Sequence, residues 1–69
     1  MEQIITSVKA IGFRGMDKTM AVGKMGVEDI ILDGTTYKAF NTTDELIMEI
    51  HPGDYLMHSV GVKAVRDEH

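Results

Sequence analysis

The chain has 69 residues, of which 43% are hydrophobic and 26% charged, with one proline and no cysteine. This length predicts one small domain over residues 1–69, and the lack of cysteine excludes a disulfide scaffold, a thiolate metal cluster and a cysteine nucleophile. The net charge of -4 argues against nonspecific nucleic-acid binding, which depends on a basic surface.

A chain of this size buries only about 60% of the surface that its unfolded form exposes, so its hydrophobic core is thin. Small domains without disulfides commonly gain stability by association, and we therefore expect a homo-oligomer. No uninterrupted apolar run exceeds three residues, and no basic segment followed by an apolar one opens the chain. These features predict neither a membrane span nor a secretory signal, and hence a cytoplasmic location.

The charges are unevenly distributed along the chain. Residues 1–26 hold four cations and two anions, a balance of +2, whereas residues 27–55 hold one cation and seven anions, a balance of -6. Two interpretations stand: an ordinary solvated surface, or a basic end that meets an anion or the acidic part of another subunit.

The composition favours strands over helices. Val, Ile and Thr make up 19 of the 69 residues, and such β-branched side chains suit a pleated surface. The first predicted strand covers residues 4–13. A hairpin follows, with strands over 27–32 and 35–40 joined by a type I′ turn at Asp33-Gly34. We expect Ile30 and Leu32 to share one face, and Tyr37 and Ala39 to line one face of the return strand with Phe40 on the other.

Segment 44–50 fits two structures. Thr42 and Glu45 form a capping-box pattern that favours a short helix, while residues 45–50 also alternate with a period of two, which favours a strand and is our preferred prediction. His51-Pro52-Gly53-Asp54 predicts a type II turn that pairs 45–50 with a strand over 55–59.

A last strand over 60–65 and a charged tail over 66–69 complete the chain. The predicted fold class is mainly β, a small SH3-like or otherwise rolled-up antiparallel barrel, with a β-rich α+β fold as the alternative.

Glycines and cations between residues 12 and 26 suggest an anion site. They do not form a Walker A loop, because Lys18 and Met25 stand where that motif needs glycine and Ser or Thr. Backbone amides near the glycines, helped by Arg14, Lys18 and Lys24, form an anion-binding nest in one interpretation. In the other, the segment is a glycine-rich connector whose lysines keep it in water.

No residue pattern supports catalysis or a metal site. His51 and His58, even with Asp54 or Glu49, lack the third well-spaced ligand of a genuine metal site, and we expect no metal and no cofactor. Ser7 and Ser59 stand outside any nucleophile elbow, so we expect a protein that is not an enzyme.

Methionine is abundant beyond the first residue. A core position is favoured for Met48 and Met57, and core and interface are equally open for Met16, Met20 and Met25.

Two stretches resemble a group of small phage and prophage proteins of unassigned function. They are VKAIGFRG at residues 8–15 and PGDYLMHSVG at residues 52–61, in the same order as in that group, and together they cover about 18 of the 69 residues. The resemblance implies a small β-rich phage accessory protein and assigns no functional residue.

Two functions from different classes follow as hypotheses. In the first, a homo-oligomer acts in the host cytoplasm and sequesters an anionic small molecule, such as a nucleotide used as an immune signal. Arg14, Lys18 and Lys24 would contact phosphates, and Tyr37 or Tyr55 would stack on a base. In the second, the acidic 27–55 region and exposed methionines bind and inhibit a host protein. A phage structural component is a third possibility.

Overall fold

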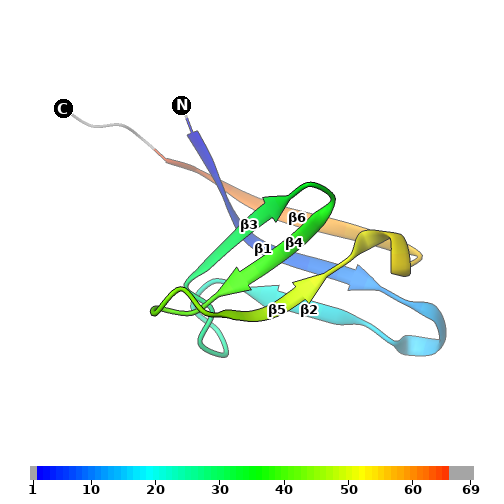
Figure 1. Ribbon diagram of the computed structural model, residues 1–69. Helices are drawn as coiled ribbons and strands as arrows, with labels where there is room; N and C mark the ends of the chain where they lie inside the picture. The colour runs from blue at the N-terminus through cyan, green and yellow to red at the C-terminus, as the bar shows by residue number, and fades with distance from the viewer. Residues whose placement is uncertain (1, 66–69) are drawn as a thin grey trace.

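The computed structural model describes residues 2–65, which form six β-strands and two short 3-10 helices. In chain order these elements are β1 (Glu2–Ile11), η1 (Phe13–Gly15), β2 (Lys18–Ala21), β3 (Asp29–Asp33), β4 (Thr36–Phe40), β5 (Leu46–Ile50), η2 (Pro52–Asp54) and β6 (Met57–Val65). The strands make two three-stranded antiparallel sheets, ordered β2-β1-β6 and β3-β4-β5 (Figure 1). The predicted mainly β, small barrel-like fold class is confirmed. Over residues 2–65, no helix has the length and apolar character to cross a membrane.

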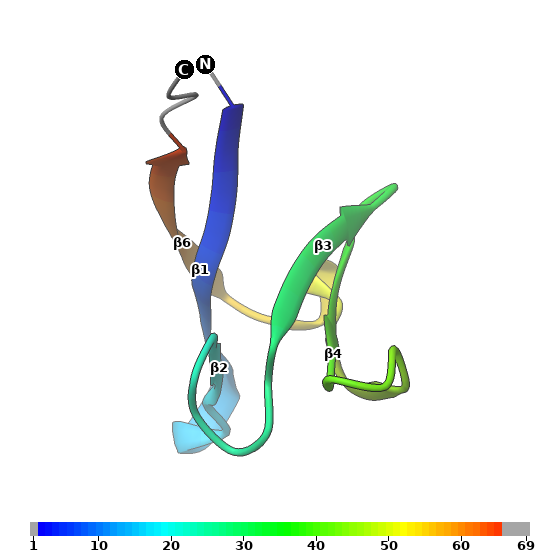
Figure 2. The same ribbon diagram turned by 90° about the vertical axis from the view of Figure 1, so that its left-hand side faces the viewer.

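The two sheets diverge from the place where they touch. β1 packs against β3, and Figure 2 shows the β1–β6 pair and the β3–β4 hairpin spreading apart like the arms of a V. The far half of the β1–β6 pair extends past the second sheet, so it forms an arm with no sheet packed against it (Figure 2).

The hydrophobic core lies where the sheets meet. Val8 and Ala10 of β1, two positions apart, both point to the inner face. Cross-strand pairing places Met20 of β2 beside Val8. The buried cluster consists of Val8, Ala10, Met20, Val27, Ile30, Ala39 and Ile50. It matches the thin interior expected of so short a chain.

The predicted hairpin is present as β3 and β4, and its face assignment is confirmed. Ile30 pairs with Ala39 and Leu32 with Tyr37, so all four side chains share the inner face. The turn is displaced from the expected one. Asp33 pairs with Thr36, so the two loop residues are 34 and 35, and only Gly34 takes a positive φ, of 65°. Glycine at the first loop position is typical of a type II′ turn, and the type I′ prediction was therefore wrong.

Segment 44–50 is a strand over its last five residues, as preferred, and the capping-box alternative is wrong. The Asn41 side chain organises the preceding loop, because its Oδ1 accepts hydrogen bonds from the backbone amides of Thr43 and Glu45, both at 2.9 Å. Asp44 in this loop takes a left-handed φ of 62°. These bonds direct the chain back along β4 as β5.

The predicted hairpin between 45–50 and 55–59 is wrong. Gly53 does not take the positive φ of a type II turn, and successive bonds from Asp54 N to His51 O (2.9 Å) and from Tyr55 N to Pro52 O (3.1 Å) make a 3-10 turn instead. Leu56 N then donates to the carbonyl of Ile11 at 2.9 Å. The chain therefore crosses to the other sheet, where β6 pairs with β1.

Two more boundaries differ from the predictions. β2 was not predicted, because its four residues lie among glycines, and the segments 55–59 and 60–65 form one strand from residue 57 onward. β1 ends at Ile11, before Gly12, where a Cβ would overlap the carbonyl oxygen of Met16. The charged tail predicted over 66–69 lies outside the described residues.

Candidate functional site

Two clefts open on the side of the molecule that carries η2. The first, here the Lys18 cleft, has a volume of about 490 Å³ and lies between the edge strands β2 and β5. The second, here the Tyr37 cleft, has a volume of about 330 Å³ and lies between the β3–β4 turn, η2 and β6. Ligand pockets in proteins commonly have volumes of about 300–1,000 Å³, so both have the size of a small-molecule site.

The Tyr37 cleft joins the two sheets through a pair of rings. Tyr37 faces inward from β4, and its ring centroid lies 5.9 Å from that of His58 on β6, with the planes tilted by 51°. His58 reaches this cleft because it pairs with Ala10, which places it on the inner face of its sheet. The full lining comprises Leu32, Gly34, Thr35, Tyr37, Pro52 and His58.

The walls of the Tyr37 cleft are largely apolar and incompletely covered. Leu32 is on the inner face of β3, yet it is 51% exposed because the sheets have diverged at this level. Tyr37 is half-buried against the core cluster, which holds its ring in place. An apolar wall with an aromatic ring and a few polar atoms suits a flat ligand ring.

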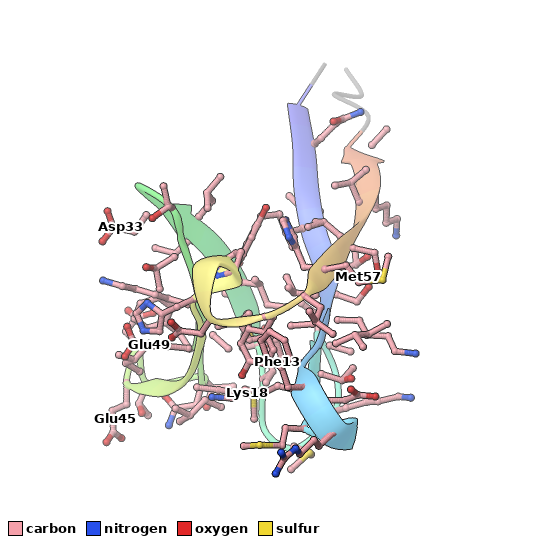
Figure 3. All side chains as sticks on the ribbon, turned by 90° about the vertical axis from the view of Figure 1, so that its right-hand side faces the viewer. Phe13, Lys18, Asp33, Glu45, Glu49 and Met57 are labelled. Carbon is pink, nitrogen blue, oxygen red and sulfur yellow. The ribbon has the colours of Figure 1, made fainter. Side chains whose placement is uncertain are left out.

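The Lys18 cleft carries the charged groups. Lys18 pairs with Ala10 of β1, so it too lies on the inner face, and the other lining residues come from β5 and the residue after it. These are Leu46, Ile47, Met48, Glu49 and His51. Figure 3 shows Lys18 and Glu49 on the same side of η2, with Asp33 at the opposite end of the β3-β4-β5 sheet. Across residues 2–65, Lys18 takes part in no ion pair, so its ammonium group is available to an anion.

η2 stands between the clefts. His51, just before it, lines the Lys18 cleft, and Pro52, its first residue, lines the Tyr37 cleft. His51 Nδ1 and Thr36 Oγ1 are 3.1 Å apart, within hydrogen-bond distance, which attaches this segment to β4.

One ion pair, between Lys38 and Asp33, lies on the outer face of the β3-β4-β5 sheet. Lys38 Nζ lies 2.8 Å from Asp33 Oδ2. The hydrogen bond from Lys38, and its positive charge, hold the pKa of the Asp33 carboxyl below its usual value. The same hydrogen bond and the Asp33 charge raise the pKa of Lys38, with a smaller contribution from Glu49 on the neighbouring strand.

The five predicted ligand-binding residues are not gathered in one cleft of the described chain. Lys18 and Tyr37 line different clefts. Arg14 is exposed in η1, before β2, with a left-handed φ of 57°, and Lys24 is exposed after β2. Figure 1 shows η1 and the turn that follows β2 at opposite ends of this strand. Tyr55 is half-buried and packs against the core cluster.

The glycine-rich connector uses several of its own amides. The N–H groups of Gly23, Lys24 and Val27 donate to carbonyls of Val27, Ala21 and Lys24 at 2.8, 3.2 and 3.0 Å. These donors are therefore occupied, and an anion nest built on them would have to replace bonds that close the turn.

The methionines divide between core and surface. Met20 is buried and Met48 packs against the core, as favoured for Met48, but Met57 is 61% exposed, and its predicted core position is wrong. Met16 and Met25 are exposed. Figure 3 shows Met57 on the side of the β1–β6 pair that faces away from the other sheet.

The sequence did not indicate that His58, Leu32 and Pro52 line one cleft. The sequence predicted no ring partner for His58. Within residues 2–65, no group of three or more His, Asp or Glu side chains is placed to hold a metal ion. His58 meets the Tyr37 ring because β6 pairs with β1. No local sequence pattern predicts that long-range pairing.

Comparisons with known protein families, with curated proteins and with solved structures give no match to this chain.

Proposed function

We propose that this chain is a non-enzymatic, homo-oligomeric binding protein of the phage-accessory kind. It acts in the host cytoplasm and sequesters an anionic small molecule that carries a flat ring, such as a nucleotide used as an immune signal. The single observation that carries the proposal is the Tyr37–His58 ring pair, 5.9 Å apart in an apolar cleft of about 330 Å³.

A base stacked in the Tyr37 cleft supplies the apolar part of recognition. Stacking of a base on an aromatic ring contributes about 1–3 kcal/mol to the free energy of binding, and it does not require a particular base. The half-buried position of Tyr37 supports this role, because a ring already packed on one side loses little freedom when a ligand covers the other.

The phosphate part of the ligand needs cations from outside this cleft. Arg14, Lys18 and Lys24 do not line the Tyr37 cleft. A ligand held between subunits resolves this, since one subunit presents Tyr37 and His58 while another presents its basic segment. Arginine and lysine bind phosphate strongly through charge-assisted hydrogen bonds.

Calorimetry against a panel of mono-, di- and cyclic nucleotides tests the proposal. We expect binding at micromolar concentration, a loss of about tenfold or more in affinity for Tyr37→Leu, which keeps apolar bulk without the ring, and no binding for Arg14→Ala with Lys18→Ala. Lys9→Ala, which removes an exposed cation of β1, is the matched control and binds as the unmodified protein does. Failure to bind any nucleotide of the panel, or full affinity of Tyr37→Leu, would overturn the proposal.

An acidic surface supports a second candidate function, the inhibition of a host protein. Asp29 and Asp33 lie on the outer face of β3 and Glu49 on the same face of β5, with Lys38 of β4 between them and paired with Asp33. A basic partner would associate faster at low salt. Capture of one host protein whose binding weakens as salt rises, with no bound small molecule, would favour this function, whereas very large assemblies in sizing would favour a phage structural component.

A further inference from the structure

The open edge of β6 is the longest free strand edge in the described chain. β6 has nine residues and, within residues 2–65, pairs only with β1, on one side. The other edge strands have four residues (β2) or five (β3 and β5). Figure 2 shows β6 on the outside of the arm, away from the second sheet. A long unpaired edge presents a row of N–H and C=O groups that can pair with another strand.

The backbone direction along this edge follows from two hydrogen bonds. Val22 N donates to the Thr6 carbonyl at 2.9 Å, so this carbonyl points toward β2, whereas the Ile11 carbonyl, which accepts from Leu56 N at 2.9 Å, points toward β6. These groups alternate along an antiparallel strand, so Ser7 turns toward β6, where it pairs with Gly61. The bulge next to this pair adds its extra residue to β1, so the alternation of β6 is uninterrupted. The residues of β6 that direct their N–H and C=O groups to the open edge are therefore His58, Val60, Val62 and Ala64.

Few of the features that protect natural edges are present on β6. Such edges usually carry charged side chains, lysine above all, as well as proline, inward-pointing charges or bulges of their own. β6 contains no proline, and its inner-face residues include Val60 and Val62, the second of which is 53% exposed. Lys63 is its one formally charged residue at neutral pH, and it lies on the outer face.

We propose that two copies of this chain join their β6 edges antiparallel, about a two-fold axis at Gly61, to make one continuous six-stranded sheet. The inference deepens the proposed homo-oligomer by naming its interface. With the axis at Gly61, Val60 pairs with Val62 of the partner subunit, and His58 pairs with Ala64 of the partner subunit. All four residues that direct their N–H and C=O groups to the open edge then pair with a residue of the partner subunit. An axis at Val60 or at Val62 would leave one of the four unpaired on each chain.

Side-chain chemistry agrees with this register. Two β-branched valines lie directly opposite each other on the inner face, a pairing that stabilises antiparallel sheets. On the outer face Lys63 opposes Ser59 of the partner subunit, so no like charges meet. His58 lines the Tyr37 cleft and belongs to this strand, so one end of the interface lies beside this cleft.

Cysteine cross-linking tests the register in a chain that contains no cysteine of its own. In the proposed dimer, residue 59 of one subunit lies opposite residue 63 of the other in a non-hydrogen-bonded pair, where directly opposed Cα atoms are about 4.5 Å apart, within the range a disulfide needs. Residues 59 and 63 of the same strand are too far apart to bond to each other. We expect the double variant Ser59→Cys with Lys63→Cys to give a covalent dimer under mild oxidation, and Ser59→Cys alone to give none.

A proline variant tests the edge by an independent readout. Val62→Pro removes an N–H that points to the open edge and leaves the bonds to β1, so the fold remains and the dimer is lost. Val62→Thr keeps the N–H and the branched shape, and stays dimeric. Sizing by light scattering reports the mass, and circular dichroism checks that both variants retain their strands.

The outcomes separate this inference from the proposed function. A monomeric unmodified protein at micromolar concentration would overturn both the interface and the homo-oligomer. An oligomer that gives no cross-link between residues 59 and 63, or that persists with folded Val62→Pro, would overturn the β6 interface and leave the homo-oligomer standing.

Discussion

Asn41 and Glu45 close the connection between β4 and β5 with two hydrogen bonds of opposite direction. The Glu45 amide donates to Asn41 Oδ1 at 2.9 Å, and the Asn41 amide donates to the Glu45 carbonyl at 3.0 Å. The same Oδ1 accepts from the Thr43 amide and hydroxyl. One side-chain oxygen thus organises a loop whose sequence also matches a helix start.

Replacement of Asn41 should therefore weaken the fold through this loop. Asn41→Ala removes the shared acceptor, and we expect a loss of about 1 kcal/mol in the free energy of unfolding, measured by urea denaturation. Asn41→Asp keeps an oxygen at the same place and should retain most of the stability. Equal losses for the two variants would show that the oxygen does not organise the loop.

Gly12 should tolerate no side chain. A Cβ there would overlap the Met16 carbonyl oxygen, a backbone atom that cannot move without opening the turn at η1. We expect Gly12→Ala to cost about 2 kcal/mol in the free energy of unfolding, by comparison with other overpacked sites. Gly53→Ala is the matched control, because a Cβ at Gly53 meets no atom within 4 Å, and it should change stability by less than about 0.5 kcal/mol. A stable Gly12→Ala protein would contradict the close approach.

Ile50 should dominate the stability of the small core. It is fully buried in the core cluster, and it pairs with Tyr37 on the inner face. Truncation of a buried isoleucine to alanine costs about 2–5 kcal/mol, which is a large part of the stability of a small domain. We expect Ile50→Ala to be largely unfolded near 37 °C by circular dichroism. Ile47→Ala, at a position that is 41% exposed, should lose less than about 1 kcal/mol. Both need the same protein concentration, because association shifts apparent stability.

The Lys38–Asp33 pair should stabilise the fold only between two pH limits. The pKa of Asp33 is lowered from 3.8 in the folded state, so its contribution is complete above that pH and is lost as the pH falls through the lowered pKa. The pKa of Lys38 is raised from 10.5, so the contribution is complete below that pH and is lost as the pH rises through the raised pKa. Lys38→Met should therefore lower the melting temperature at neutral pH and converge with the unmodified protein at both extremes.

Carboxyl titration by NMR gives the direct readout of this pair. In Lys38→Met the pKa of Asp33 should rise toward its ordinary value, because both causes of its depression are removed. Lys63→Met, which removes a cation on the other sheet, should leave the Asp33 titration unchanged. An unchanged Asp33 titration in Lys38→Met would contradict the pairing.

Local chemistry made part of the structure predictable. The Asp33-Gly34 pair predicted the β3–β4 hairpin, and strand alternation predicted that Ile30 and Leu32 share one face and that Tyr37 and Ala39 share one face of the return strand. The turn itself moved by one residue, since cross-strand pairing of Asp33 with Thr36 leaves only Gly34 and Thr35 for the loop. Propensity could not choose that register, because the two alternatives differ only in contacts across the strands.

Composition and residue order suffice to predict a small β-rich fold with a thin core and an acidic middle segment. β-branched content, glycine spacing and charge are local properties, and their effects do not depend on which strands pair with each other. The pairing of β6 with β1, and not with β5 across the Pro52 turn, is visible only in the three-dimensional structure. This pairing brings His58 to Tyr37 and leaves the other edge of β6 open. The physical reason is that β pairing joins residues about 50 positions apart, and the choice between partner strands depends on burial in the whole fold.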